Sequence, residues 1–183
     1  MSITQERANT IIGQRMLRRE DPALLTGEAK FTNDLVRPGA LHLAVLRSPY
    51  AHARIKSINV SDALAMPGVV AVYTGKDLRD AWAAPMPCAW PVTPDMKNPA
   101  HFPLALDKVC YVGDGVVAVL AHSETESRDA LDAIDVAYEP LQAITDLEVA
   151  LSDKTIIHED LGTNKSYTWN LKVEGTEGAV DEA

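Results

Sequence analysis

The stretch ALHLAVLRSPYAHARIKSINVSDALAMP, residues 40–67, decides the fold. Apolar residues dominate residues 41–47 and alternate with polar ones over residues 54–60, at the two-residue period typical of β-strands. Residues 61–66 then carry good helix formers and stop at a Pro-Gly pair. The same order of strand, turn and short capped helix returns at residues 109–139. Two such halves predict an α+β fold, with a mixed sheet and short helices packed on it.

The pattern also predicts where single elements lie. Residues 41–47 are apolar on both sides, which favours a strand buried in the centre of a sheet. Residues 29–34 alternate weakly and predict a short strand, and residues 166–174 predict a last one. Three hydroxyl residues precede helix formers and are expected to act as N-caps, the last in a capping box with Glu126: Ser61, Thr74 and Ser123.

Composition sets the class of protein. A chain of 183 residues is long enough for one domain with a buried core. The net charge of −9 argues against nucleic acid and anionic membranes as partners, because both need a positive surface. No apolar run reaches the roughly 20 residues that span a bilayer, and residues 1–10 lack the apolar centre of a signal peptide.

Residues 80–103 differ from the rest of the chain. They hold six of the eleven prolines and two of the three tryptophans, a composition that excludes helices and central strands. The segment is therefore predicted to be a long loop. Two interpretations remain open: a surface excursion held by its own aromatic residues, or a flap that contacts a partner chain or a substrate channel.

A basic cluster near the N-terminus, Arg15, Arg18 and Arg19, also has two interpretations. It forms a solvated turn with local ion pairs to Glu20 and Asp21, or it is a docking patch for an acidic partner. The first of these is favoured.

Residues that could carry chemistry do not form a recognisable pattern. The spacing of Cys88 and Cys110 matches no metal site, and two reduced thiols are favoured over a disulfide. No two histidines share the spacing of metal ligands, and His52 is expected to hydrogen-bond backbone in a crowded turn. Gly113-Asp114-Gly115 predicts a tight turn rather than a phosphate loop. We therefore expect no catalytic, cofactor-binding or metal-binding residue in this chain.

Several blocks of the sequence resemble one family. The most specific is RSPYAHARI at residues 47–55, followed in register by DALAMPGV at residues 62–69. Earlier matches lie at residues 13–19, 21, 25–27, 31–34 and 38–42. Later matches are Tyr111-Val112-Gly113, Ala130, VAYEPL at residues 136–141 and HEDLGTN at residues 158–164. These blocks resemble the molybdopterin-binding large subunit of the xanthine dehydrogenase, aldehyde oxidase and carbon monoxide dehydrogenase family. Asp114-Gly115 departs from the family, which often has a proline at the second position.

The resemblance implies that the chain is the N-terminal a/b hammerhead domain of such a subunit. Members hydroxylate a carbon centre or oxidise carbon monoxide with water as oxygen source. The resemblance further implies a molybdopterin cofactor, expected in the cytosine dinucleotide form and held by later domains, with 2Fe–2S clusters and FAD on partner subunits or domains. A bacterial, cytoplasmic enzyme assembled as an oligomer of heterotrimers is expected, and the isolated chain is expected to be inactive.

The expected domain organisation has three parts. Residues 1–12 form a flexible N-terminus, residues 13–174 the hammerhead domain with its proline-rich loop at 80–103, and residues 175–183 the start of a linker to the molybdopterin-binding domains. Two alternatives belong to other classes. One is a stand-alone protein-binding or assembly module, and the other is a hydrolase, for which no nucleophile and base are found in the sequence.

Overall fold

The computed structural model describes residues 12–88 and 93–169, which fall into two compact units, Met1–Ala40 and Leu41–Ala183. The expected linker at residues 175–183 and nearly all of the expected flexible N-terminus lie outside the described residues. The strand expected at residues 166–174 is absent from its described part, residues 166–169, and the remainder lies outside.

In its described residues, 12–40, the first unit contains one short helix, α2 (Asp21–Thr26), and one 3-10 turn, η2 (Thr32–Asp34). The strand expected at residues 29–34 is wrong, because the Asp34 carboxylate accepts a hydrogen bond from the Phe31 amide at 2.9 Å and closes the turn. Gly27 ends α2 with a positive φ of 75°, a conformation that glycine adopts without steric cost. Arg18 lies 3.8 Å from Asp21, which agrees with a solvated turn carrying a local ion pair.

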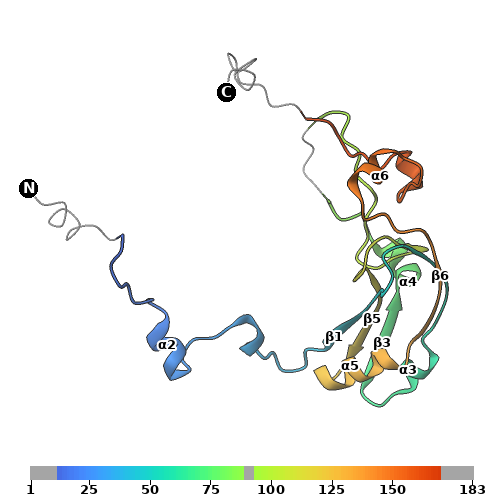
Figure 1. Cartoon of the computed structure of the whole chain (residues 1–183). Helices are drawn as coiled ribbons and strands as arrows, with labels where there is room; N and C mark the ends of the chain where they lie inside the picture. The colour runs from blue at the N-terminus through green and yellow to red at the C-terminus, as the bar shows by residue number, and fades with distance from the viewer. Residues whose placement is uncertain (1–11, 89–92, 170–183) are drawn as a thin grey trace, which may run out of the picture. The chain divides into compact units, whose positions relative to one another are not determined.

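The second unit contains two three-stranded antiparallel sheets (Figure 1). The first sheet has the order β1 (His42–Arg47), β5 (Gly115–Ala121), β3 (Val69–Thr74). The second has the order β4 (Lys108–Val109), β2 (Ala53–Asn59), β6 (Asp135–Pro140). The expected α+β class is confirmed, and the strands divide into two sheets where one mixed sheet was expected.

Strand β5 is the centre of the first sheet. It pairs with β1 on one side and β3 on the other, and Val116, Val117 and Val119 are fully buried. The expectation that residues 41–47 form the central strand is therefore wrong: β1 lies at the edge, and Leu43 is 62% exposed. An apolar pattern on both sides of a strand indicates contact on both faces and does not identify its neighbours.

A bulge interrupts β2. Its pairing with β6 shifts between Ile55 and Ser57, so Ala53 and Ile55 are buried while the next apolar residue to turn inward is Ile58. The extra residue is accommodated by a local twist of the strand. The regular alternation expected over residues 54–60 is thus broken in its middle.

Two helices cover one face of the first sheet. Ala63 of α3 (Ser61–Ala65) and Ala130 of α5 (Glu124–Asp132) are both fully buried against Val119 of β5. Small side chains at these positions let the helices approach the strand closely. The second sheet joins the core at the other end of β5, where Ala53 and Val109 pack with Val116 and Val117.

The expected helix caps are confirmed at two of three positions. Thr74 caps α4 (Gly75–Leu78) in a reciprocal pair with Asp77, and the Ser123 hydroxyl accepts from the Glu126 amide at 3.2 Å. Ser61 does not cap α3 but is its first residue; the Asn59 side chain instead accepts from the Ser61 amide at 3.1 Å. The Glu126 carboxylate accepts from the Ser123 hydroxyl at 2.8 Å, and not from the Ser123 amide as the expected capping box requires.

The remaining short elements are η3 (Arg79–Ala81), α6 (Leu147–Leu151) and η4 (Glu159–Leu161). Asn164 fastens the segment around α6: its side chain donates to Ala150 and Thr155 carbonyls and accepts from the Ile157 amide at 2.9 Å. Among the helices in the described ranges, none is long and apolar enough to cross a membrane.

The described part of residues 80–103 is a loop, as expected. Trp82 stacks on Phe102 with ring centroids 5.3 Å apart, and an isolated bridge joins Met86 to His101. These contacts hold the two limbs of the loop together, which supports the interpretation that the excursion is held by its own aromatic residues.

Candidate functional site

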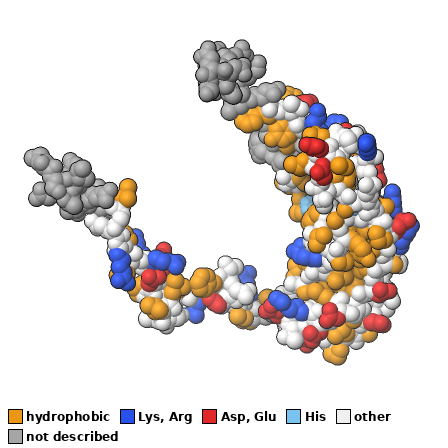
Figure 2. Space-filling view, viewed as in Figure 1, with side chains coloured by type: hydrophobic (Ala, Val, Ile, Leu, Met, Phe, Trp, Pro, Cys, Tyr) orange, Lys and Arg blue, Asp and Glu red, His pale blue; other side chains and the backbone are white. Residues whose placement is uncertain are grey.

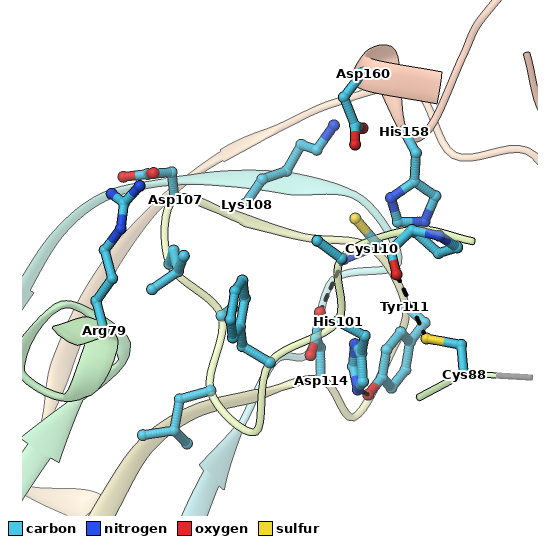
Figure 3. Close-up of a pocket in the computed structure, with 16 residues that line it drawn as sticks. Arg79, Cys88, His101, Asp107, Lys108, Cys110, Tyr111, Asp114, His158 and Asp160 are labelled. Carbon is cyan, nitrogen blue, oxygen red and sulfur yellow. Dashed lines mark hydrogen bonds between the residues drawn. The ribbon is translucent and has the colours of Figure 1, made fainter. Parts of the chain in front are cut away.

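A cavity of about 890 Å³ lies in the second unit (Figure 3). The proline-rich loop, the segment that follows it through β4 to Asp114, and η4 contribute its walls. Besides Phe102, ten polar or aromatic side chains line it: Arg79, Cys88, His101, Asp107, Lys108, Cys110, Tyr111, Asp114, His158 and Asp160.

A tight turn at Asp114 supports the cavity. The Asp114 side chain is 5% exposed, and its carboxylate accepts a hydrogen bond from the Cys110 amide at 3.1 Å. Its carbonyl accepts from the Ser48 amide at 2.8 Å, and the Ser48 carbonyl accepts from Gly113 at 2.8 Å. Gly113 has a φ of 93°, so the expected tight turn is confirmed. Asp114 therefore binds the chain's own backbone at the position where a phosphate loop would offer free amides.

An aromatic pair forms one wall of the cavity. The rings of His101 and Tyr111 lie 5.8 Å apart, and the Tyr111 hydroxyl lies 3.4 Å from His101 Nε2. Burial raises the pKa of Tyr111, so its hydroxyl stays protonated at neutral pH. Cys88 lies beside this wall, and its Sγ contacts the Pro99 carbonyl oxygen at 3.6 Å.

A lysine fixes the opposite wall. Lys108 Nζ donates to the Ile157 carbonyl and to Glu159 Oε2, the latter at 2.8 Å. The ammonium group lowers the pKa of Glu159, which stays ionised. Burial, and after it the charge of Lys108, lower the pKa of His158, so its imidazole is neutral at pH 7.

These side chains do not form an activated nucleophile. Both cysteines are free thiols, and burial raises the pKa of Cys110, which keeps its thiol in the unreactive protonated form. Over the described ranges, no three His, Cys, Asp or Glu side chains are grouped in a way that could hold a metal ion. The cavity therefore presents aromatic and hydrogen-bonding side chains around an open space.

His52 lies behind the cavity wall in the turn between the two sheets. It is 4% exposed, and its Nδ1 lies 2.9 Å from the Gln142 carbonyl oxygen, as expected for a ring bonded to backbone in a crowded turn. Because a carbonyl only accepts, the proton is on Nδ1, and Nε2 is buried without a partner among the described residues.

The structure brings together residues that no sequence pattern connects. His101 and His158 are far apart in the chain, yet both line the cavity, and so do Cys88 and Cys110. No spacing rule connects them, because the loop at 80–103 and the turn at η4 set the distances. Asp107, for which the sequence offers no partner, lies 3.3 Å from Lys76.

Comparisons with known proteins identify the fold. The family described as aldehyde oxidase and xanthine dehydrogenase, a/b hammerhead domain, matches residues 26–142. The gamma subunit of the 6-hydroxypseudooxynicotine dehydrogenase complex of Paenarthrobacter nicotinovorans is 38% identical over 174 residues, which are 94% of this chain and 21% of that protein. The xanthine dehydrogenase molybdenum-binding subunit of Escherichia coli O157:H7 is 33% identical over 161 residues, 87% of this chain and 21% of that subunit.

A solved structure gives the same result. Quinoline 2-oxidoreductase from Pseudomonas putida 86 superposes with a TM-score of 0.73 at 40% identity, over 83% of this chain and 19% of that one. The chain thus spans about one fifth of the length of the proteins it matches. The family match covers both sheets and the cavity residues from Arg79 to Asp114, whereas His158 and Asp160 lie beyond it. The chain belongs to the aldehyde oxidase and xanthine dehydrogenase family, as its a/b hammerhead domain.

Proposed function

We propose that this chain is the N-terminal scaffold domain of the large subunit of a molybdenum hydroxylase. The observation that carries the proposal is the match of nearly the whole chain to one fifth of a molybdenum-binding subunit and of a dehydrogenase subunit. The domain contributes packing surfaces rather than reacting groups. Residues 13–174 form the domain, and residues 1–12 and 175–183 are the segments that flank it.

The chemistry of the cavity supports a scaffold role. Its thiol at Cys110 is protonated, its carboxylate at Asp114 is bonded to backbone, and its lysine is neutralised by Glu159. None of these groups is poised to transfer a proton or attack a substrate. We propose that the chain has no catalytic, cofactor-binding or metal-binding residue of its own.

The complete enzyme, in this proposal, carries molybdopterin in its cytosine dinucleotide form on later domains of the large subunit. Its 2Fe–2S clusters and FAD lie on partner subunits or domains, in an oligomer of heterotrimers in the bacterial cytoplasm. The large subunit hydroxylates a carbon centre with oxygen from water. The names of the relatives, which act on nicotine derivatives, quinoline and xanthine, support an N-heteroaromatic substrate.

Turnover by the complete enzyme tests the proposal. The gene that encodes this sequence is expressed with its partner subunits, and reduction of a dye acceptor is followed with quinoline, xanthine and nicotine as substrates. We expect turnover by the assembly and none by residues 1–183 alone. We also expect the Cys110→Ser variant of the assembly to keep kcat within about twofold. Turnover by the isolated chain, or loss of kcat in that variant with its cofactors retained, contradicts the proposal.

A further inference from the structure

The register of the first sheet assigns its residues to two faces. Residues directly opposite each other in an antiparallel pair lie on the same face. One row across the strands is Ala44, Val119 and Val72. Val119 packs against Ala63 of α3 and Ala130 of α5, so this row marks the face that the helices cover.

The other face, which we call the outer face, consists of two rows. The first is Leu43, Leu120 and Ala71, and the second is Val45, Ala118 and Tyr73. All six side chains are apolar or aromatic, and none of them is fully buried. Leu43 is 62% exposed and Tyr73 is 38% exposed. On the side of the second unit that Figure 2 shows, apolar side chains reach the surface among charged ones.

An uncovered apolar sheet face indicates a binding surface. Strands of a half-exposed antiparallel sheet ordinarily alternate apolar and polar residues, so that the solvent face is polar. Here both faces of β5 are apolar, as in a strand that is covered on both sides. Contiguous exposed apolar patches mark interaction sites in folded proteins. The outer face carries no charged side chain, so its partner must present apolar groups.

The parts of this sequence without a described structure are short, and their composition does not favour them as such a partner. Residues 170–183 contain four acidic side chains, and residues 1–11 are mostly polar. Residues 89–92 are too few to cover three strands. In contrast, about four fifths of each relative's length lies outside the matching region.

We propose that the outer face is the surface on which a later domain of the same polypeptide packs, through a layer of apolar side chains. This rests on the proposed function, because it requires a large subunit that continues beyond residue 183. It assigns the contact to Leu43, Leu120, Tyr73 and their neighbours. It leaves the cavity of Figure 3 outside the contact.

Photo-cross-linking in the complete enzyme tests the inference. Benzoylphenylalanine replaces Tyr73 or Leu43 in the full-length large subunit, and Leu64 provides the matched control. Leu64 is 50% exposed but belongs to α3, which lies on the opposite side of the sheet. After irradiation, mass spectrometry identifies the cross-linked peptides. We expect positions 73 and 43 to give at least tenfold more cross-link than position 64, to residues beyond 183 of the same chain.

Other products overturn the inference. These are cross-links to a second copy, to a separate subunit or to residues 12–40, or a yield no higher than that of the control in an enzyme that retains activity. The length of the polypeptide is measured on the same samples before irradiation. A chain that ends near residue 183 defeats the proposed function, whereas a long chain with the wrong cross-links defeats only the assignment of this face.

Discussion

Replacing Gly115 by alanine tests how closely the end of the proline-rich loop approaches β5. A Cβ atom at this position would lie 2.7 Å from the Pro103 carbonyl oxygen and 3.4 Å from Leu104 Cδ2. The Gly115 carbonyl also accepts a hydrogen bond from the Ala105 amide at 2.7 Å. The loop therefore cannot move away from the new methyl group without stretching this bond.

The structure sets the size of the effect. Ordinary contacts of a Cβ atom begin near 3.4 Å, so the Pro103 carbonyl must retreat by about 0.7 Å. Overpacking of this kind costs about 1–3 kcal/mol, and the reduced entropy of the unfolded chain returns about 0.4–1 kcal/mol. We expect the Gly115→Ala variant to lose about 1–2 kcal/mol in the free energy of unfolding.

Urea unfolding followed by circular dichroism measures the loss, and hydrogen exchange of the Ala105 amide locates it. The control is Gly113→Ala, which strains a positive φ of 93° but meets no atom within 4 Å. It should lower stability by about 1 kcal/mol and leave Ala105 exchange unchanged. If Gly115→Ala leaves both the urea midpoint and the hydrogen exchange of the Ala105 amide unaltered, the close approach of the loop to β5 is refuted.

Three further predictions concern the core, the C-terminal fastening and pH. Val119→Ala removes a fully buried side chain from the centre of the first sheet and should cost about 2 kcal/mol in urea unfolding; a loss below 0.5 kcal/mol contradicts the assigned core. Asn164→Ala removes three hydrogen bonds and should cost about 2 kcal/mol, with proteolysis near α6 accelerated; wild-type protease resistance contradicts this. The pKa of His158 is lower in the folded chain than its ordinary value of 6.5. As the pH drops from 7 to 5, the unfolded chain therefore binds more protons than the folded chain, and the free energy of unfolding falls. His158→Gln should flatten this slope, and an equally steep slope in the variant shows that other groups cause it.

Local rules in the sequence predict local structure well. Thr74 and Ser123 cap helices because a hydroxyl before a helix start has amides within reach, whatever the rest of the fold does. Gly27 ends α2 for an equally local reason. The bond between His52 and backbone is predicted by small neighbours that leave the ring no other partner nearby.

Properties that depend on distant segments are not predictable in this way. β1 lies at the edge because its partner β5, some 70 residues later in the chain, takes the central position of the sheet. The bulge in β2 follows from the register of β6. The cavity depends on how the proline-rich loop closes over β4, so neither the pairing of His101 with Tyr111 nor the proximity of His158 has a sequence signal.

The family resemblance predicts the fold, which the local sequence rules do not. It correctly predicts the a/b hammerhead domain and the α+β class from short blocks such as residues 47–55. In the structure this block contains the end of β1, the buried Ser48 and His52, and the start of β2. It therefore forms the connection between the two sheets, which explains why this motif identifies the fold.

The size and metal content of the native polypeptide test the central claim most directly. The protein is isolated from its source cells with an antibody to this chain and analysed by gel electrophoresis and elemental analysis. We predict a polypeptide several times larger than 19.8 kDa that co-purifies with molybdenum, iron and flavin. A metal-free polypeptide of 19.8 kDa would contradict the account and favour a stand-alone binding module.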